Sequence, residues 1–154
     1  MNTPRRIYVD GVWDCYHKGH VRHLKECKYL ENRENTLIVG VISDVDAESY
    51  KRKPLYDESH RAELVTSCRH VDEVIETPPL RITKKFLIDN RIDLVCHAFS
   101  TSQEAEFQTK GFFSIPEKLG LFRALKYTPG VSTTQILAES KTAQARRKTA
   151  VADE

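Results

Sequence analysis

The hydrophobic positions of the chain fall into five short runs with the character of β-strands. Residues 36–42 form a nearly continuous apolar run, which is typical of a strand covered on both faces of a sheet. Shorter runs that are rich in apolar and β-branched residues predict four more strands. These strands are expected at roughly 6–10, 71–75, 93–96 and 121–127.

Helix-like patterns separate these runs. In residues 19–32, apolar positions recur at the three- and four-residue spacing of an amphipathic helix. Asp57 or Glu58 is a suitable first residue for a second helix, and Thr83 is a suitable N-cap for a third. Residues 100–118 are polar and mixed, and we expect short helices there.

The C-terminal part is expected to hold a turn and one more helix. Thr128-Pro129-Gly130 is typical of a turn, and Ser132 with Gln135 has the spacing of a capping box. Beyond this helix the apolar residues become rare. We therefore expect one folded domain over residues 1–138, followed by the end of the helix and a disordered charged tail over residues 139–154.

The alternation of strands and helices favours an α/β fold. The expected architecture is a doubly wound, Rossmann-like, parallel five-stranded sheet with helices on both faces. In such sheets, ligands bind at the carboxyl ends of the strands, near the point where the strand order reverses. This places four segments on one rim of the sheet, namely 10–20, 43–54, 96–102 and 127–134.

Composition narrows the class of protein. The 154 residues carry a net charge of only +2, which argues against a strongly basic nucleic-acid-binding protein. The 4 cysteines include no C-x-x-C pair, and we interpret them as reduced thiols of a cytoplasmic protein. With no signal-peptide pattern and no apolar run of about 18 residues, we expect no integral membrane segment.

The segment between the first strand and the first helix carries the candidate chemistry. His17 and His20 lie where the helix begins, with Gly19 between them. The N–H groups and partial positive charge of a helix start suit phosphate, and Gly19 leaves room for it to approach. Two imidazoles there can donate hydrogen bonds to a charge-rich transition state. The alternative is that the two histidines belong to an ordinary helix start and have no functional role.

Several familiar site types are not matched by this segment. His23 extends the histidine series, but a helix would turn it away from His17, and no acidic or cysteine ligand is adjacent. We therefore expect no metal held by the protein at this trio. Neither the G-x-G-x-x-G fingerprint nor a Walker lysine motif is present.

Two other rim segments supply groups for a polyphosphate. Lys51 and Lys53 lie in a polar loop expected after residue 43, where a long cationic side chain can reach over phosphates, although a solvated loop is the alternative. A second helix start offers hydroxyl and N–H groups at Ser132, Thr133 and Thr134, although Ser132 also fits an ordinary N-cap. Two helix starts and a lysine loop favour a nucleoside triphosphate over a dinucleotide.

Paired signatures then give a family resemblance. Asp10-Gly11-Val12-Trp13-Asp14 with His17-Lys18-Gly19-His20 resembles the opening of the cytidylyltransferases that activate phosphocholine, phosphoethanolamine and glycerol phosphate, within the HxGH nucleotidyltransferase superfamily. Residues 130–136 (Gly-Val-Ser-Thr-Thr-Gln-Ile) are similar to the second signature of that family. The resemblance spans residue 6 to about residue 138, and the eukaryotic choline- and ethanolamine-phosphate enzymes look nearer than the bacterial ones.

The resemblance implies a CTP-dependent cytidylyltransferase that transfers CMP from CTP to a phosphorylated alcohol and releases pyrophosphate. The implied catalytic residues are His17, His20 and Lys51, acting without a covalent intermediate. Mg²⁺ would accompany the CTP, bound mainly through phosphate oxygens and water. Family members are often dimers, so a homodimer is expected. The long basic helix of the animal choline enzymes is absent, so we expect no control by membrane lipids.

The same resemblance implies two sets of binding residues. The implied CTP contacts are Gly11, Val12, Trp13, Asp14, Gly19, Arg61, His97, Gly130, Ser132, Thr133 and Thr134. The implied acceptor contacts are Asp14, Leu80 and Phe99. In this scheme Thr133 holds the outer phosphates and Asp14 organises the histidine turn. Arg61 either contacts CTP or positions a loop.

Three positions depart from the family pattern. Tyr127 stands where the family usually has an arginine, and neither Arg123 nor Lys126 is an obvious replacement, since strand alternation would turn Lys126 to the other face. Ala98-Phe99 replaces acidic residues that help to bind substrate, and Leu80 replaces a tryptophan of the choline enzymes. The identity of the acceptor alcohol is therefore left open.

Three functions stay open at this point. The first is an active CTP-dependent enzyme that supplies phospholipid synthesis. The second is a nucleotide-binding pseudoenzyme or regulatory subunit, which Tyr127 and Ala98-Phe99 favour. The third is a sibling nucleotidyltransferase that uses another base or another acceptor.

Overall fold

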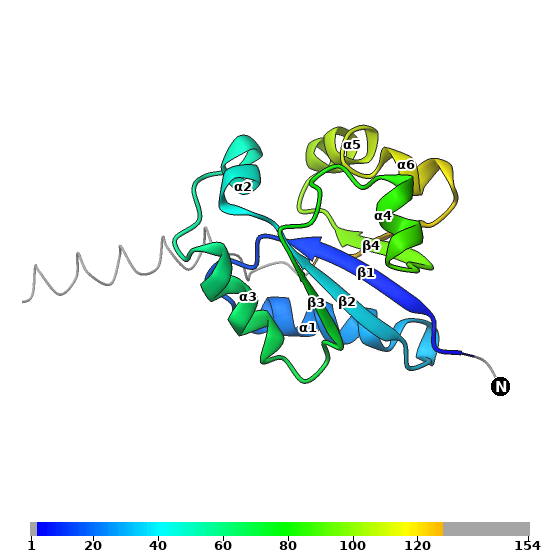
Figure 1. The fold of residues 1–154 in the computed structure, drawn as a ribbon. Helices are drawn as coiled ribbons and strands as arrows, with labels where there is room; N and C mark the ends of the chain where they lie inside the picture. The colour runs from blue at the N-terminus through cyan, green and yellow to red at the C-terminus, as the bar shows by residue number, and fades with distance from the viewer. Residues whose placement is uncertain (1–2, 128–154) are drawn as a thin grey trace, which may run out of the picture.

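A five-stranded parallel sheet organises the molecule (Figure 1). The computed structural model describes residues 3–127. The strands are β1 (Arg6–Gly11), β2 (Thr36–Val41), β3 (Glu73–Glu76), β4 (Leu94–Ala98) and β5 (Phe122–Leu125). Their order in the sheet is β3-β2-β1-β4-β5, and every neighbouring pair is parallel. The predicted five-stranded α/β fold is therefore confirmed.

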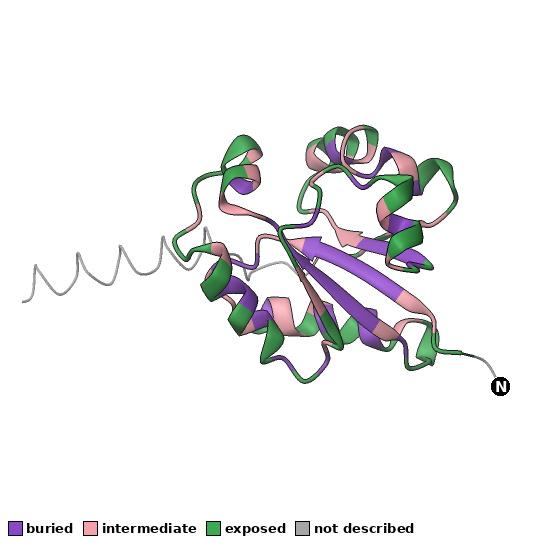
Figure 2. Ribbon diagram, viewed as in Figure 1, coloured by how far each residue is buried: buried purple, intermediate pink, exposed green. Residues whose placement is uncertain are grey.

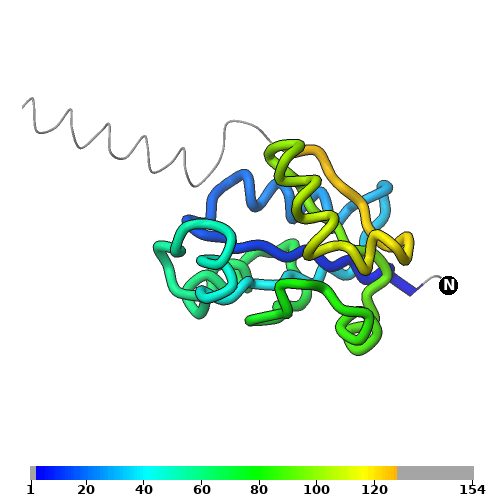
Figure 3. The backbone as a smooth tube through the Cα atoms, turned by 90° about the horizontal axis from the view of Figure 1, so that it is seen from above, coloured from blue at the N-terminus to red at the C-terminus, as the bar shows by residue number. Residues whose placement is uncertain are grey.

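Helices connect the strands and cover both faces of the sheet (Figure 1). They are α1 (Lys18–Lys28), the short 3₁₀ helix η1 (Leu30–Asn32), α2 (Asp44–Tyr50), α3 (Glu58–Thr66), α4 (Lys84–Asp89), α5 (Ser102–Lys110) and α6 (Ser114–Lys118). Helices α1 and α3 pack on one face, and α4 and α6 pack on the other. Seen from above, β1 runs through the middle of the molecule (Figure 3).

The alternation of side chains along the central strands divides the core into two layers. In β1, Ile7 and Val9 belong to the layer shared with α1 and α3, and Tyr8 belongs to the layer shared with α4. Figure 2 shows β1 and β2 as buried for most of their length. Gly40 makes room for the Tyr8 ring, because a Cβ there would lie 2.1 Å from the Tyr8 hydroxyl oxygen. Burial on both faces explains the continuous apolar run in β2.

Side-chain caps fix where two helices begin. The Asp57 carboxylate accepts the His60 N–H at 2.8 Å at the start of α3. The Thr83 hydroxyl accepts the Phe86 N–H at 3.1 Å at the start of α4. Both capping predictions are confirmed, and the short helices expected within 100–118 are found as α5 and α6.

Two predicted boundaries are wrong. The segment after residue 43 begins with a helix and not a loop, because the Ser43 hydroxyl accepts the Asp46 N–H at 3.1 Å and starts α2. A serine followed by acidic residues in the first turn was the available signal. The helix predicted over 19–32 is also too long, because Glu31 has a positive φ of 60° and α1 ends before it.

Some predictions lie outside the described residues. These are the turn, the last helix and the tail, and with them Gly130, Ser132, Thr133 and Thr134. Within residues 3–127, no helix combines the length and the apolar character that a bilayer span requires. The four cysteines are free thiols.

Candidate functional site

An open cavity of about 790 Å³ lies at the carboxyl ends of β1 and β4, where the strand order reverses. Residues of three predicted rim segments line it together, and Tyr127 comes from the fourth. Helix α5 forms a further wall that the sequence did not single out, with Gln103, Glu104, Phe107 and Gln108. The volume is in the usual range for a site that holds a nucleotide-sized ligand.

The two imidazoles at the start of α1 hold each other in place. The Gly19 N–H donates to His17 Nδ1 at 3.1 Å, and the His17 N–H donates to His20 Nδ1 at 3.1 Å. The two rings stack with their centroids 3.9 Å apart. Because Nδ1 of each ring accepts a hydrogen bond, a neutral imidazole carries its proton on Nε2. Each ring therefore keeps one N–H donor for a ligand.

Burial keeps both rings neutral. Desolvation lowers the pKa of His17 below its usual value of 6.5, and it lowers the pKa of His20 to about 3, with further contributions from neighbouring positive groups. Neutral N–H donors can stabilise charge on an anionic ligand without losing a proton. Gly19 lines the cavity and its N–H is bonded to His17, so its implied contact with CTP stays a prediction.

Lys51 follows directly after α2 and brings a cation to the cavity. Its backbone N–H donates to the Ala47 carbonyl at 2.9 Å, and its side chain is exposed. Burial lowers the pKa of His20 and His97, and the positive charge of Lys51 lowers both further; for Asp10, burial raises the pKa and the charge of Lys51 offsets part of that rise. The ammonium therefore lies within electrostatic reach of both the histidine turn and the end of β4.

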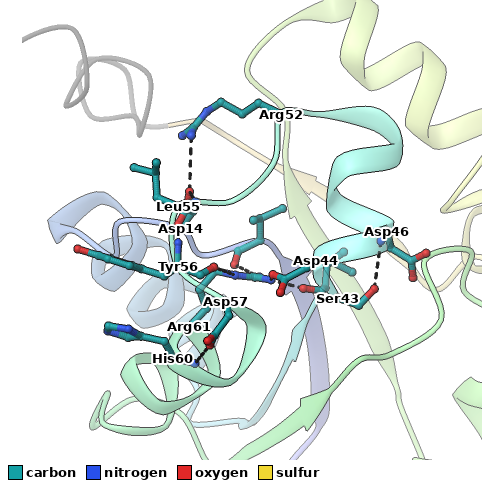
Figure 4. A network of polar contacts seen from close by, with 12 residues as sticks. Asp14, Ser43, Asp44, Asp46, Arg52, Leu55, Tyr56, Asp57, His60 and Arg61 are labelled. Carbon is teal, nitrogen blue, oxygen red and sulfur yellow. Dashed lines mark hydrogen bonds and ion pairs between the residues drawn. The ribbon is translucent and has the colours of Figure 1, made fainter. Parts of the chain in front are cut away.

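Asp14 fastens the loop that follows Lys51 (Figure 4). Its buried carboxylate accepts the N–H of Leu55 at 2.9 Å and that of Tyr56 at 3.2 Å. Arg52 approaches the same carboxylate at 3.7 Å. Asp14 therefore connects the segment before the histidines with the loop after α2. This connection helps to fix the position of Lys51, with which the loop begins.

Arg61 is fully buried, and its guanidinium is committed to groups of the protein (Figure 4). It donates to the carbonyls of Val12 at 2.6 Å, Ile42 at 2.9 Å and Tyr56 at 2.9 Å. Its remaining nitrogen pairs with Asp44 at 2.7 Å. Arg61 does not line the cavity. The expectation that it contacts CTP is thus corrected in favour of its other implied role, positioning the surrounding loops.

Trp13 forms a buried wall beside the histidine turn. Its indole N–H donates to the Gly40 carbonyl at 2.9 Å, and its ring meets His20 edge to face with centroids 5.5 Å apart. A Cβ on Gly11 would come within 2.9 Å of the Trp13 ring. Glycine at position 11 is therefore required by this packing.

Asp10 opens the first family signature and lines the cavity, although it is not among the implied site residues. It is 6% exposed, and its Oδ1 lies 3.8 Å from His97 Nδ1, an atom with no hydrogen-bond partner among residues 3–127. Burial raises the pKa of Asp10 to about 7 and lowers that of His97 to about 3. The available signal was a carboxylate that directly follows the apolar residues Ile7, Tyr8 and Val9 of β1.

Replacing Asp10 by asparagine is expected to increase stability relative to the natural chain as the pH rises. The folded pKa of about 7 exceeds the usual 3.8, so unfolding releases a proton between these values and the natural chain loses stability through that window. The difference in the free energy of unfolding should grow by at most about 1.4 kcal/mol per pH unit. Urea unfolding of both chains between about pH 4 and 7 measures it. A difference that does not change with pH would contradict the assignment.

Two implied acceptor residues do not line the cavity. Leu80 is absent from its lining, and so is Phe99. The Phe99 ring packs in the core, with centroids 6.0 Å from Phe113 and 6.1 Å from Phe122. The structure therefore does not bring Leu80 and Phe99 into the described cavity lining, and their contact with the acceptor stays a prediction.

Tyr127 and Lys126 both line the cavity. The expectation that Lys126 points away is wrong, because β5 ends at Leu125 and strand alternation ends with it. Arg123 is engaged elsewhere, in an ion pair of 2.7 Å with Glu31. Lys126 is therefore the cation that stands beside the tyrosine in this part of the site.

The family model described as cytidylyltransferase-like matches residues 8–139. The chain belongs to this family. Choline-phosphate cytidylyltransferase of Saccharomyces cerevisiae is 36% identical to it over 138 residues, which cover 90% of this chain and 32% of that protein. Choline-phosphate cytidylyltransferase A of Homo sapiens is 36% identical over 138 residues, which cover 87% of this chain and 36% of that protein. Ethanolamine-phosphate cytidylyltransferase of Dictyostelium discoideum is 34% identical over 134 residues, which cover 87% of this chain and 36% of that protein.

This cytidylyltransferase-like chain spans about a third of the length of those relatives. Among solved structures, a lipopolysaccharide core biosynthesis protein from Thermoplasma volcanium is similar, with a TM-score of 0.60 and 28% identity, covering 80% of this chain and 96% of that one. A protein of unknown function from Archaeoglobus fulgidus shares the fold, with a TM-score of 0.54 and 18% identity, covering 82% and 93%. The fold of these two solved structures is thus consistent with the family to which the chain belongs.

Proposed function

We propose that the chain transfers CMP from CTP to a phosphorylated amino alcohol, either phosphocholine or phosphoethanolamine. The products are a CDP-alcohol for phospholipid synthesis and pyrophosphate. The observation that carries this proposal is the cavity of a cytidylyltransferase-like chain, in which two neutral imidazoles and Lys51 converge at the sheet edge.

In the proposed reaction, an oxygen of the acceptor phosphate attacks the α-phosphorus of CTP in line. The bond from that phosphorus to the bridging oxygen breaks, and pyrophosphate leaves with the electron pair. The Nε2–H groups of His17 and His20 donate to the phosphate oxygens, and Lys51 neutralises charge between the two substrates. Because no covalent intermediate is needed, the chain contributes positioning and charge stabilisation.

The proposed cofactor is Mg²⁺ that arrives with CTP. Within residues 3–127 no group of three or more histidine, cysteine or acidic side chains is arranged to hold a metal ion. The donor set therefore fits an ion held mainly by triphosphate oxygens and water, with Asp10 as a buried carboxylate of the cavity lining. Such an ion would neutralise charge on the leaving pyrophosphate.

The proposed setting is a cytoplasmic homodimer that acts on small molecules and not on nucleic acid. A net charge of +2 and free thiols support this setting. Ser132, Thr133 and Thr134 are proposed to hold the outer phosphates together with Gly130, as the family resemblance implies.

Pyrophosphate release tests the proposed function. CTP or ATP is supplied with phosphocholine, phosphoethanolamine, glycerol 3-phosphate or phosphopantetheine, and pyrophosphate is measured by a coupled assay. We expect release with CTP and an amino alcohol phosphate, and little release with ATP. Preference for ATP or for phosphopantetheine would contradict the proposal and favour a sibling nucleotidyltransferase.

A second candidate function is that of a nucleotide-binding regulatory subunit. It is favoured by Tyr127, which lines the cavity where the family usually has an arginine. Tight CTP binding without pyrophosphate release from any acceptor would support this alternative. Lys126 in the same lining argues for the active enzyme, because it restores a positive charge there.

A further inference from the structure

The α5 wall of the cavity combines a carboxylate with an aromatic ring. Glu104 and Phe107 lie one helical turn apart and both line the cavity, and Phe107 is 65% exposed. An exposed phenylalanine in the cavity lining gives a ligand an aromatic face. Neither residue is accounted for by the roles proposed so far.

The Glu104 carboxylate is held in one orientation. Its Oε2 accepts the Ser100 N–H at 3.0 Å and also the Ser100 hydroxyl, and its Oε1 accepts the Gln108 amide at 3.1 Å. Burial alone would raise the pKa of Glu104, but the hydrogen bonds from Ser100 and the charge of Lys51 bring it below its usual value. Glu104 is therefore ionised at neutral pH, and Oε1 retains the capacity to accept another hydrogen bond.

The other carboxylates in the described lining have different surroundings. Asp14 accepts two backbone N–H groups of the loop after Lys51, and Asp10 is buried at the end of β1 with a raised pKa. Glu104 is the carboxylate that lies beside an exposed aromatic ring.

We propose that Glu104 and Phe107 bind the cationic head group of the acceptor, and that this head group is a primary ammonium. The inference rests on the proposed function and names its acceptor as a phosphorylated primary amino alcohol. The acceptor phosphate lies at Lys51, which is close enough to influence Glu104, and the ammonium reaches the α5 wall. The N–H groups of the ammonium donate to Glu104, and the Phe107 face contacts its positive charge.

The surroundings favour a primary over a quaternary ammonium. A trimethylammonium group has no N–H to donate and gains most from several aromatic faces. Phe99 and Leu80 are outside the lining, whereas Trp13, Tyr50 and Tyr127 line the cavity together with Phe107. Aromatic faces therefore do not separate the two head groups, and the choice between them rests on the Glu104 carboxylate. A carboxylate with a free acceptor position instead suits a group with three N–H donors.

Steady-state kinetics of Glu104→Gln tests the proposal. With CTP, the natural chain is expected to use phosphoethanolamine in preference to phosphocholine and glycerol 3-phosphate. Glu104→Gln keeps the size of the side chain but removes its charge, and should lower kcat/KM for phosphoethanolamine about tenfold or more, mainly through KM. The KM for CTP and the kcat/KM for glycerol 3-phosphate should change less than about twofold.

The matched control is Glu106→Gln on the same helix. Glu106 is exposed, pairs with Lys110 and does not line the cavity, so this change should leave all acceptors unaffected. A parallel loss with every acceptor after Glu104→Gln would assign Glu104 a structural role and overturn the proposal. So would a natural chain that prefers phosphocholine or glycerol 3-phosphate. Absence of pyrophosphate with every acceptor would instead overturn the proposed function on which this inference rests.

Discussion

Replacing Lys51 by alanine is expected to reduce kcat by about 100- to 1000-fold, which is the usual cost of removing one preorganised group that stabilises transition-state charge. Lys51 lines the cavity, and its charge is felt at both the histidine turn and the end of β4. Because the side chain is exposed and follows α2, its removal should leave the melting temperature within about 1 °C. Steady-state pyrophosphate release and thermal unfolding measure the two effects.

Lys53→Ala is the matched control for this experiment. Lys53 is exposed in the same loop and does not line the cavity, so its loss should change kcat by less than about twofold. A Lys51→Ala chain that keeps more than about a tenth of the natural rate would contradict the role given to Lys51.

Replacing Arg61 by methionine is expected to lower the free energy of unfolding by about 3–5 kcal/mol, because each buried group that loses its hydrogen-bond partner costs about 1–3 kcal/mol. The methionine fills much of the space but leaves the carbonyls of Val12, Ile42 and Tyr56 without their donor. Val12 lines the cavity, and Ile42 and Tyr56 directly precede the N-caps of α2 and α3. Urea unfolding measures the change in stability.

Arg22→Met is the control for the removal of an arginine. Arg22 is exposed on α1, so its replacement should change the free energy of unfolding by less than about 0.5 kcal/mol. An Arg61→Met chain that is as stable as the Arg22→Met chain, yet binds CTP much more weakly, would show that Arg61 acts on the ligand and not on the loops.

The fold was largely predictable because strong local signals agreed with the global arrangement. The apolar run of β2 reflects burial on both faces, and the caps at Asp57 and Thr83 mark real helix starts. Prediction from the sequence failed where the local signal covered only a few residues. Ser43 starts a helix of only seven residues, and a positive φ at Glu31 ends α1 early.

The site was predictable where spacing along the chain decides geometry. His17 and His20 are three residues apart at a helix start, and this spacing alone lets each ring cap the turn. Contacts between distant segments could not be read in the same way. Arg61 resembles an exposed helical arginine in sequence, and only the meeting of three loops around it buries its guanidinium.

Residues of the α5 wall illustrate the same limit. The segment is polar and mixed, with weak helical periodicity. Thr101 and Glu104 have the spacing of a capping box, which marks Glu104 as part of a helix start, but no pattern marks it as a cavity residue. The distinction arises because α5 forms a wall of the cavity, where Glu104 lines the cavity and Glu106 is exposed outside it. Such a difference depends on tertiary structure.

Following the phosphorus atoms tests the central claim most directly, because that claim is a transfer of CMP at the cavity. ³¹P NMR of the full chain with Mg²⁺, CTP and phosphoethanolamine should show pyrophosphate and CDP-ethanolamine appearing in equal amounts while CTP disappears. Phosphate and CDP from simple hydrolysis, or CTP that stays intact while bound, would contradict the account.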